Sequence, residues 1–177
     1  MAEINGFEIE YEQVFEAIMD SPNDLLVKFN YTETESEVIV NPGDTYINNI
    51  GTVVDAQSLL ANGRDTRLQG QSDTIANFQI GLDNLQNQTQ ATLIVNYVSD
   101  RVRARGIDVL PDIIEEPPLL VDFAFSKIYS YPEFELKLSL ELRNLLDEEY
   151  YASMRNIAIY DQYDLGTSAS LGFKISF

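Results

Sequence analysis

The last part of the chain, residues 165–177, alternates between apolar and small polar side chains. Its apolar parity reads Leu165, Thr167, Ala169, Leu171, Phe173, Ile175 and Phe177. The other parity holds only glycine, serine and lysine. Successive side chains of a β-strand point to opposite faces, so the pattern predicts a strand with one apolar face. An ordinary strand has roughly 5–6 residues, whereas roughly 9–11 cross a bilayer. A long edge strand of a soluble β-protein shows the same pattern. Whether this segment crosses a membrane therefore depends on whether the rest of the chain repeats the pattern.

Earlier parts of the chain repeat this alternation. The alternating segments are about 4–15, 25–34, 68–83, 89–102, 119–129 and 134–142. Residues 8–19 also fit a helix, because apolar side chains there recur at helical spacing. Their aromatic and β-branched residues favour the strand. We therefore predict an all-β fold, an antiparallel meander of about seven long strands forming one domain over residues 1–177.

The connections between these segments alternate between short and long. The long ones are 37–67, 103–118 and 147–162, and the first has room for a short helix over 53–60. Transmembrane β-barrels have short turns at one rim and long loops at the other. Aromatic residues near the strand ends predict two interfacial girdles. At the short-turn rim these are Phe15, Tyr129, Tyr131, Phe134 and Phe177, and at the other rim Tyr31, Tyr97, Tyr150, Tyr151, Tyr160 and Tyr163.

Charge and composition exclude several classes of function. The net charge is −18, from 29 acidic against 11 basic residues, which argues against binding nucleic acid or anionic lipid surfaces. The chain has no cysteine and no histidine, so thiol chemistry, the usual zinc sites and the commonest general base are missing. A glycine-rich phosphate loop and a nucleophile elbow are also missing. We predict no enzyme, no cofactor and no metal site.

Two rows of charged residues leave alternatives open. Glu8, Glu10 and Glu12 share one parity, and they either line a wet lumen, pair with bases on a neighbouring strand or form a solvated face. Arg101, Arg103 and Arg105 recur at every second position. They either contact an anionic ligand or lipopolysaccharide, or pair with nearby acids.

The segment 142–151 carries a family resemblance. It resembles the NLxDxxYY motif of TonB-dependent outer-membrane receptors, which opens the last extracellular loop, and the matching residues are Asn144, Leu145, Asp147 and Tyr150. The closing strand also resembles that family. Its alternate residues Leu171, Phe173, Ile175 and Phe177 resemble the signal that the barrel-assembly machinery reads. Segment 4–9 is similar to the GxE strand starts of these barrels, and segments 30–34 and 96–99 resemble their NYT and NYxS strands.

The resemblance implies the C-terminal third of a 22-stranded transmembrane barrel in the outer membrane of a Gram-negative cell. A plug, a TonB box and a signal peptide are not found in the sequence, so we expect a fragment or a truncated gene product. The implied partners are outer-membrane lipid and lipopolysaccharide, the barrel-assembly machinery, TonB through the absent N-terminal part, and a small molecule such as an iron–siderophore complex. Carbohydrate or cobalamin also fits the family.

The three long connections hold the candidate ligand-facing residues. These are Tyr46, Arg64, Arg105 and Arg155.

Two other functions compete with the receptor. One is a passive porin-like barrel, and the other is a soluble acidic β-sheet protein that binds a partner.

Overall fold

The computed structural model describes residues 1–18, 22–48, 50–60, 65–106, 110–155 and 157–177. These residues form thirteen β-strands in antiparallel sheets and one 3-10 helix, η2 (Ala56–Leu59). The predicted all-β, antiparallel fold is therefore confirmed. Within the described residues, no helix is long and apolar enough to cross a membrane.

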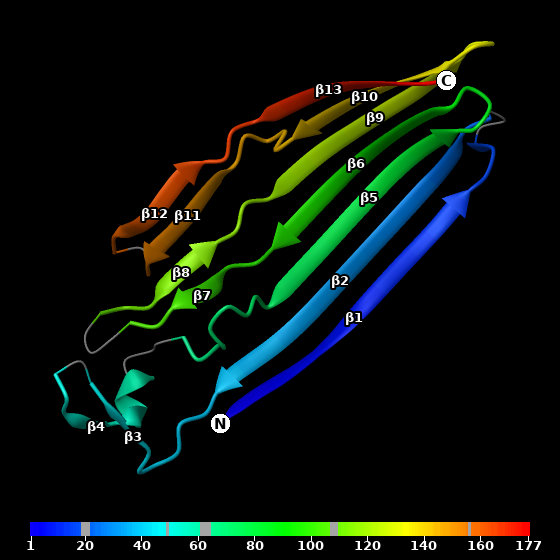
Figure 1. Ribbon diagram of the computed structural model, residues 1–177. Coiled ribbons are helices and arrows are strands. Elements are labelled where there is room, and N and C mark those ends of the chain that lie inside the picture. The colour runs from blue at the N-terminus through cyan, green and yellow to red at the C-terminus, as the bar shows by residue number, and fades with distance from the viewer. Residues whose placement is uncertain (19–21, 49, 61–64, 107–109, 156) are drawn as a thin grey trace.

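One large sheet dominates the molecule. Its strands are β1 (Ala2–Phe15), β2 (Asp24–Val38), β5 (Thr74–Asn84), β6 (Thr89–Val98), β9 (Leu120–Ser130), β10 (Glu135–Arg143) and β13 (Ser168–Ser176). They lie in the order of the sequence, and each is antiparallel to its neighbours. Figure 1 shows them side by side in a single layer, with β1 and β13 at its two open edges.

The three long connections contain strands that the sequence did not predict. A four-stranded sheet consists of β7 (Arg101–Ala104), β8 (Ile113–Glu116), β11 (Glu149–Met154) and β12 (Ile159–Asp164). A separate hairpin consists of β3 (Thr45–Ile47) and β4 (Val53–Asp55). These strands have three to six residues, too few for alternation to stand out. The count of about seven strands therefore describes the large sheet and misses these six.

Several predicted boundaries also need correction. The segment expected to begin at residue 68 becomes a strand only at Thr74, because the chain first turns at Gly70, which has a φ of 80°. The segment 89–102 is interrupted after Val98 and resumes at Arg101 as a strand of the other sheet. Residues 8–15 are strand rather than helix, and β1 ends at Phe15. The possible helix over 53–60 is a strand followed by the short helix η2.

The register of the large sheet brings the apolar parities of all its strands onto one face. A single cross-strand row joins Phe15, Leu25, Leu82, Ala91, Phe125, Leu140 and Leu171. On the opposite face, a mostly polar row joins Glu12, Lys28, Gln79, Ile94 and Asp122. The sheet thus has one predominantly apolar face, which Gln13 and Lys127 interrupt, and one predominantly polar face.

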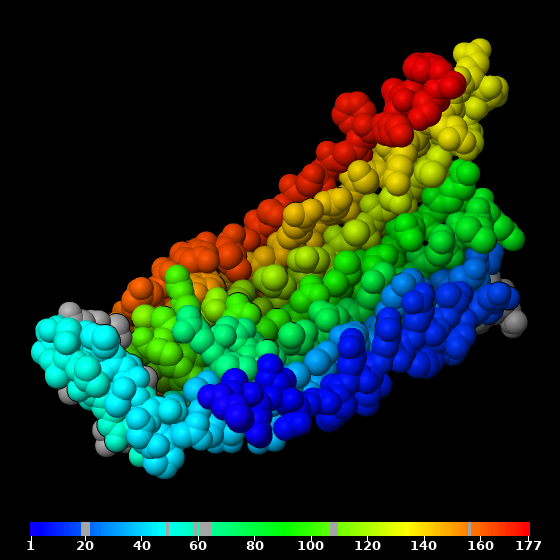
Figure 2. All heavy atoms as spheres, turned by 60° about the horizontal axis from the view of Figure 1, so that its bottom comes forward, coloured from blue at the N-terminus to red at the C-terminus, as the bar shows by residue number. Residues whose placement is uncertain are grey.

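No second layer covers the apolar face in the described chain. The buried apolar residues are Ala56, Val102 and Ala152, and all three lie outside the large sheet. Leu171 and Phe173 on β13 are 78% and 77% exposed. Figure 2 shows the elongated shape, with the cyan residues of the β3–β4 region gathered at one end. Side chains on this face therefore contact their sheet neighbours but no opposing layer.

Aromatic side chains lie near both ends of the large sheet. At the short-turn end, Phe15 closes β1, and the rings of Tyr131 and Phe134 stack with their centroids 4.7 Å apart. Tyr31 lies in the middle of β2, not at its end. It is nevertheless level with Tyr97 on β6, because Ala76 of β5 pairs with both residues.

Candidate functional site

The four-stranded sheet and the segment 65–73 lie together at the long-connection end of the molecule (Figure 1). The family-like motif connects this region to the large sheet. Asn144 is 5% exposed and has a φ of 52°, a left-handed conformation that asparagine tolerates better than most residues. Its backbone N–H donates to Asp122 Oδ1 at 2.9 Å, which fixes the end of β10 against β9.

The Asn144 side chain holds the turn that follows. Its Nδ2 donates to the carbonyls of Glu148 at 3.1 Å and Gly166 at 3.3 Å, and its Oδ1 accepts from the Glu148 N–H. The Thr167 hydroxyl donates to the Asn144 carbonyl at 2.9 Å. Asn144 therefore joins the ends of three strands: β9, β10 and β13. Leu145 and Asp147 lie exposed in the same turn.

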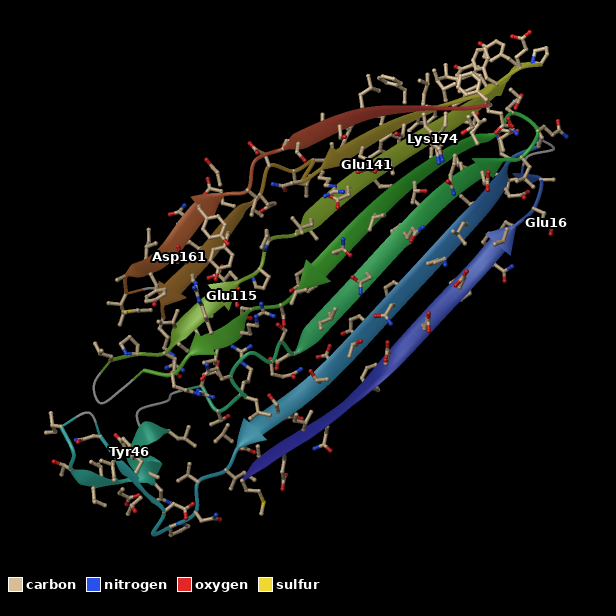
Figure 3. The ribbon with its side chains drawn as sticks, in the orientation of Figure 1. Glu16, Tyr46, Glu115, Glu141, Asp161 and Lys174 are labelled. Atoms are coloured by element: carbon tan, nitrogen blue, oxygen red, sulfur yellow. The ribbon has the colours of Figure 1, made fainter. Side chains whose placement is uncertain are left out.

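The motif tyrosine belongs to a cluster of aromatic and charged side chains. The rings of Tyr150 and Tyr163 stack at 4.6 Å. Arg103 donates to the Tyr150 hydroxyl at 2.8 Å and to Asp161 Oδ2 at 3.0 Å, and its guanidinium also lies over the ring of Tyr160 at 5.4 Å. Figure 3 shows Asp161 and Glu115 on the four-stranded sheet, whereas Tyr46 lies on the separate β3–β4 hairpin.

All three arginines of the period-two row are ion-paired. Arg101 contacts Glu115 at 2.8 Å, Arg103 contacts Asp161 at 3.0 Å, and Arg105 contacts Asp112 at 3.0 Å. Of the two alternatives left open by the sequence, the structure shows pairing with nearby acids. The Arg101 and Arg103 guanidinium groups thereby link β7 to β8 and to β12, respectively.

The ion pairs shift the pKa values of their members. The hydrogen bond from Arg101 holds the pKa of the Glu115 carboxyl below its ordinary value, and a hydrogen bond from the Tyr150 hydroxyl adds to the effect. Burial and the hydrogen bond to Glu115 raise the pKa of Tyr150. Glu115 is therefore held ionised in the folded sheet.

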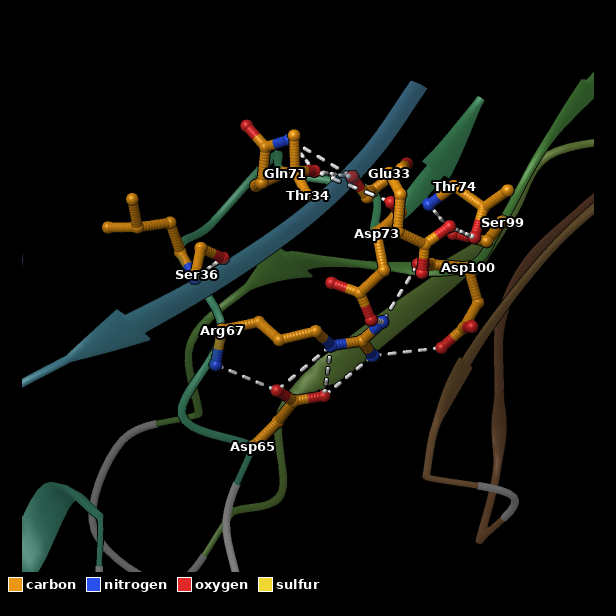
Figure 4. Close-up of polar contacts among 12 residues, drawn as sticks. Glu33, Thr34, Ser36, Asp65, Arg67, Gln71, Asp73, Thr74, Ser99 and Asp100 are labelled. Atoms are coloured by element: carbon orange, nitrogen blue, oxygen red, sulfur yellow. Dashed lines mark hydrogen bonds and ion pairs between the residues drawn. The ribbon is translucent and has the colours of Figure 1, made fainter. Parts of the chain in front are cut away.

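Arg67 holds the segment 65–73 against the start of β7, as Figure 4 shows. Its Nε and Nη2 donate to Asp65, its Nη2 also donates to Asp100 Oδ2 at 2.9 Å, and its Nη1 donates to Asp73 Oδ2 and the Asp100 carbonyl. All five N–H donors of the guanidinium are thus used. Arg105 adds bonds to the carbonyls of Asp65 and Arg67. The alternation pattern does not predict this cluster, and the Asp65–Arg67 spacing is a local signal for one of its ion pairs.

Hydrogen bonding in this cluster also affects titration. Burial raises the pKa of Asp65, but the hydrogen bonds and the charge of Arg67 outweigh it, so the pKa lies below its ordinary value. Hydrogen bonding to Asp65 raises the pKa of Arg67. Both groups therefore stay charged near neutral pH.

A pocket of about 690 Å³ opens beside this cluster. It is lined by Asp65, Arg67, Tyr97, Val98, Ser99, Asp100, Ile114, Glu116, Pro117, Ser153 and Arg155. The Asp65 and Asp100 side chains both pair with Arg67, whereas Arg155 is exposed at the end of β11. The pocket combines charged groups with the aromatic ring of Tyr97. Within the described chain, no group of three or more acidic, histidine or cysteine residues is arranged to hold a metal ion.

The structure separates the candidate ligand-facing residues. Arg155 lines the pocket, whereas Arg105 does not line it and is half-buried and paired with the fully buried Asp112. Tyr46 is half-buried on β3, within the separate hairpin. Arg64 lies outside the described residues. Of the three candidates that the structure describes, Arg155 alone lines the pocket.

The expected assembly signal lies on the open edge of the large sheet. Leu171, Phe173 and Ile175 share the apolar face of β13, and Phe177 follows the strand with its side chain fully exposed.

Comparisons with protein-family models, with curated proteins and with solved structures found no match for this chain.

Proposed function

We propose that this chain forms part of the wall of a transmembrane β-barrel in the bacterial outer membrane. Within that class, it is the C-terminal barrel part of a TonB-dependent receptor that takes up a scarce nutrient such as an iron–siderophore complex. The single observation that carries the proposal is a predominantly apolar face that extends across seven antiparallel strands and that no second layer covers among the described residues.

Energetics favour lipid as the missing layer. Removing a leucine or phenylalanine side chain from water is worth about 1.5–3 kcal/mol. A face made of such side chains is costly in water, and hydrocarbon chains would cover it. Strands β13 and β10 have nine residues, β9 has eleven and β2 has fifteen, against the roughly 9–11 that a tilted membrane strand needs.

The two ends of the sheet support an orientation. Short turns connect the strands at one end, and the long connections with their own small sheets lie at the other, as in outer-membrane barrels. In this proposal the polar face lines a wet lumen, and the four-stranded sheet stands outside the membrane.

Two observations favour the receptor over a passive porin. The motif around Asn144 organises the last long connection, as the family resemblance implies. The pocket that includes Arg155 gives the outer end a place to hold a small ligand.

Tryptophan placed on opposite faces of one strand tests the membrane assignment. The chain has no natural tryptophan, and Ser139 and Leu140 are neighbours whose side chains point to opposite faces of β10. In lipid vesicles, we expect Leu140→Trp to show blue-shifted emission that brominated lipids quench. Ser139→Trp, the matched control, should stay accessible to iodide in water.

The rival soluble protein makes the opposite prediction. It would remain a folded monomer without detergent, and lipid would leave the emission of both tryptophans unchanged. That result would remove the membrane assignment. Saturable binding of a ferric trihydroxamate to the vesicles would separate a receptor from a passive porin.

A further inference from the structure

The outer edge of β1 offers a row of backbone groups for pairing. Met1 and Ile39 exchange two backbone hydrogen bonds, of 2.9 and 2.8 Å, so this pair is of the hydrogen-bonded type. The register then runs without a bulge from Ala2 to Phe15. Since hydrogen-bonded pairs alternate along an antiparallel ladder, odd residues of β1 bond to β2. The N–H and C=O groups of its even residues point to the open edge.

The middle even residues are all acidic. Glu8 accepts from Asn30 Nδ2 at 2.5 Å, and Glu12 pairs with Lys28 at 3.0 Å, so both are anchored to β2. Between them, Glu10 has no ion pair within the described chain. β1 itself contains no lysine or arginine. Any strand that bonds to this edge therefore places a residue directly opposite each of the three glutamates.

Copies of this chain fit that edge poorly. Because seven strands alternate in direction, β1 and β13 run the same way, so β13 of a second copy would meet β1 in parallel. Antiparallel pairing of β1 with the β1 of a second copy would set glutamates opposite glutamates. Like charges directly opposite one another destabilise a sheet.

We propose that the outer edge of β1 is a pairing site for an antiparallel strand of another polypeptide segment, with lysine or arginine opposite Glu8, Glu10 and Glu12. Apolar residues at the intervening positions would continue the apolar face past Ile9 and Tyr11. The inference builds on the proposed membrane wall, because only a paired edge is tolerated in lipid.

Disulfide trapping with synthetic strands tests this pairing. The chain has no cysteine, so Val14→Cys, at an edge-facing position, provides a single reporter. The probe is a peptide of about eleven residues, long enough for a membrane strand. It carries a cysteine opposite residue 14 and then three lysines at every second position, with apolar residues between them. The control peptide has glutamate in place of each lysine.

We expect the lysine peptide to be trapped at least about fivefold more than the glutamate peptide at low salt, since opposite charges stabilise cross-strand pairs. The preference should disappear in the Glu8→Gln, Glu10→Gln, Glu12→Gln variant, and it should shrink at about 1 M salt, where charges are screened beyond about 3 Å. Equal trapping of both peptides, or disulfide-linked homodimers in place of either adduct, would overturn the proposal.

The two proposals can fail separately. The tryptophan pair on β10 reports whether the sheet enters lipid, and peptide selectivity reports what the β1 edge accepts. Circular dichroism identifies the medium, detergent or water, in which the sheet is folded, and trapping is measured in that medium.

Discussion

Asn144 shows how one residue can fix the geometry of three strands. Its short amide both donates and accepts, so it binds two carbonyls and one N–H that no longer belong to a strand ladder. Its positive φ allows the chain to leave β10 sharply. The sequence predicted this position as part of a motif, but the hydrogen bonds depend on Gly166, which is 22 residues away.

Replacing Asn144 with alanine should destabilise the protein by about 2–4 kcal/mol. The change leaves the buried partners of a polar side chain unsatisfied and puts alanine in a left-handed conformation. Urea or guanidinium unfolding in detergent measures the loss. Leu145→Ala, in the same turn but 38% exposed, is the control and should cost less than about 1 kcal/mol. Equal losses would show that the Asn144 hydrogen bonds contribute nothing specific.

At the scale of elements, the four-stranded sheet depends on side chains more than on strand length. Its ladders are short, and β7 and β8 shift register between Val102 and Ala104. The Arg101–Glu115 pair crosses the β7–β8 ladder, and Arg103 reaches over to Asp161 on β12. Charge therefore supplies part of the cohesion that an apolar core gives to other sheets.

The low pKa of Glu115 predicts how this sheet responds to acid. A carboxyl whose pKa is lower in the folded state stabilises the fold fully above its unfolded pKa, ordinarily 4.5. That stabilisation is lost as the pH falls through the lower, folded pKa. Unfolding free energies measured from about pH 6 to pH 3 should therefore decline, and less steeply in Glu115→Gln.

Glu141→Gln provides the comparison for that experiment. Glu141 pairs with Arg143, which lies two residues further along β10, and the Glu141 side chain is 51% exposed. Exposed pairs contribute little to stability, so this variant should follow the wild-type pH profile. The interpretation fails if Glu141→Gln and Glu115→Gln flatten the profile equally.

Local alternation was enough to predict the presence of the seven strands of the large sheet and the face on which most of their apolar side chains lie, although the bounds of two strands needed correction. It could not predict β3, β4, β8, β11 and β12, because strands of three to six residues carry too few alternations. It also took the first half of β7 as the end of β6, since the predicted strand ran on to residue 102. Local alternation also did not predict the Arg67 cluster. Arg67 meets Asp100 only because the chain turns back at Gly70, and nothing local to either residue encodes that contact.

At the scale of the whole molecule, the open sheet allows assembly and stability to be measured separately. Phe177 is fully exposed, so Phe177→Ala should change the unfolding free energy by less than about 0.5 kcal/mol. If the terminal aromatic is the assembly signal that the resemblance implies, the same variant, expressed in cells with an export leader, should reach the outer membrane in smaller amounts. Ser176→Ala, on the polar face, is the control.

Two outcomes would contradict the role of Phe177. One is a marked loss of stability in vitro, which would make Phe177 a packing residue. The other is unchanged outer-membrane insertion, which would leave the terminal ring without a part in assembly.

The odd number of strands in the large sheet also decides where the chain begins and ends in space. Met1 lies at the end with the long connections, and Phe177 lies at the end with the short turns (Figure 1). In the proposed membrane orientation, Met1 would meet the medium outside the cell, and Phe177 would meet the periplasm. An antibody epitope joined to Met1 and one joined to Phe177 would thus be separated by the full thickness of the bilayer, and only the first could be labelled on intact cells.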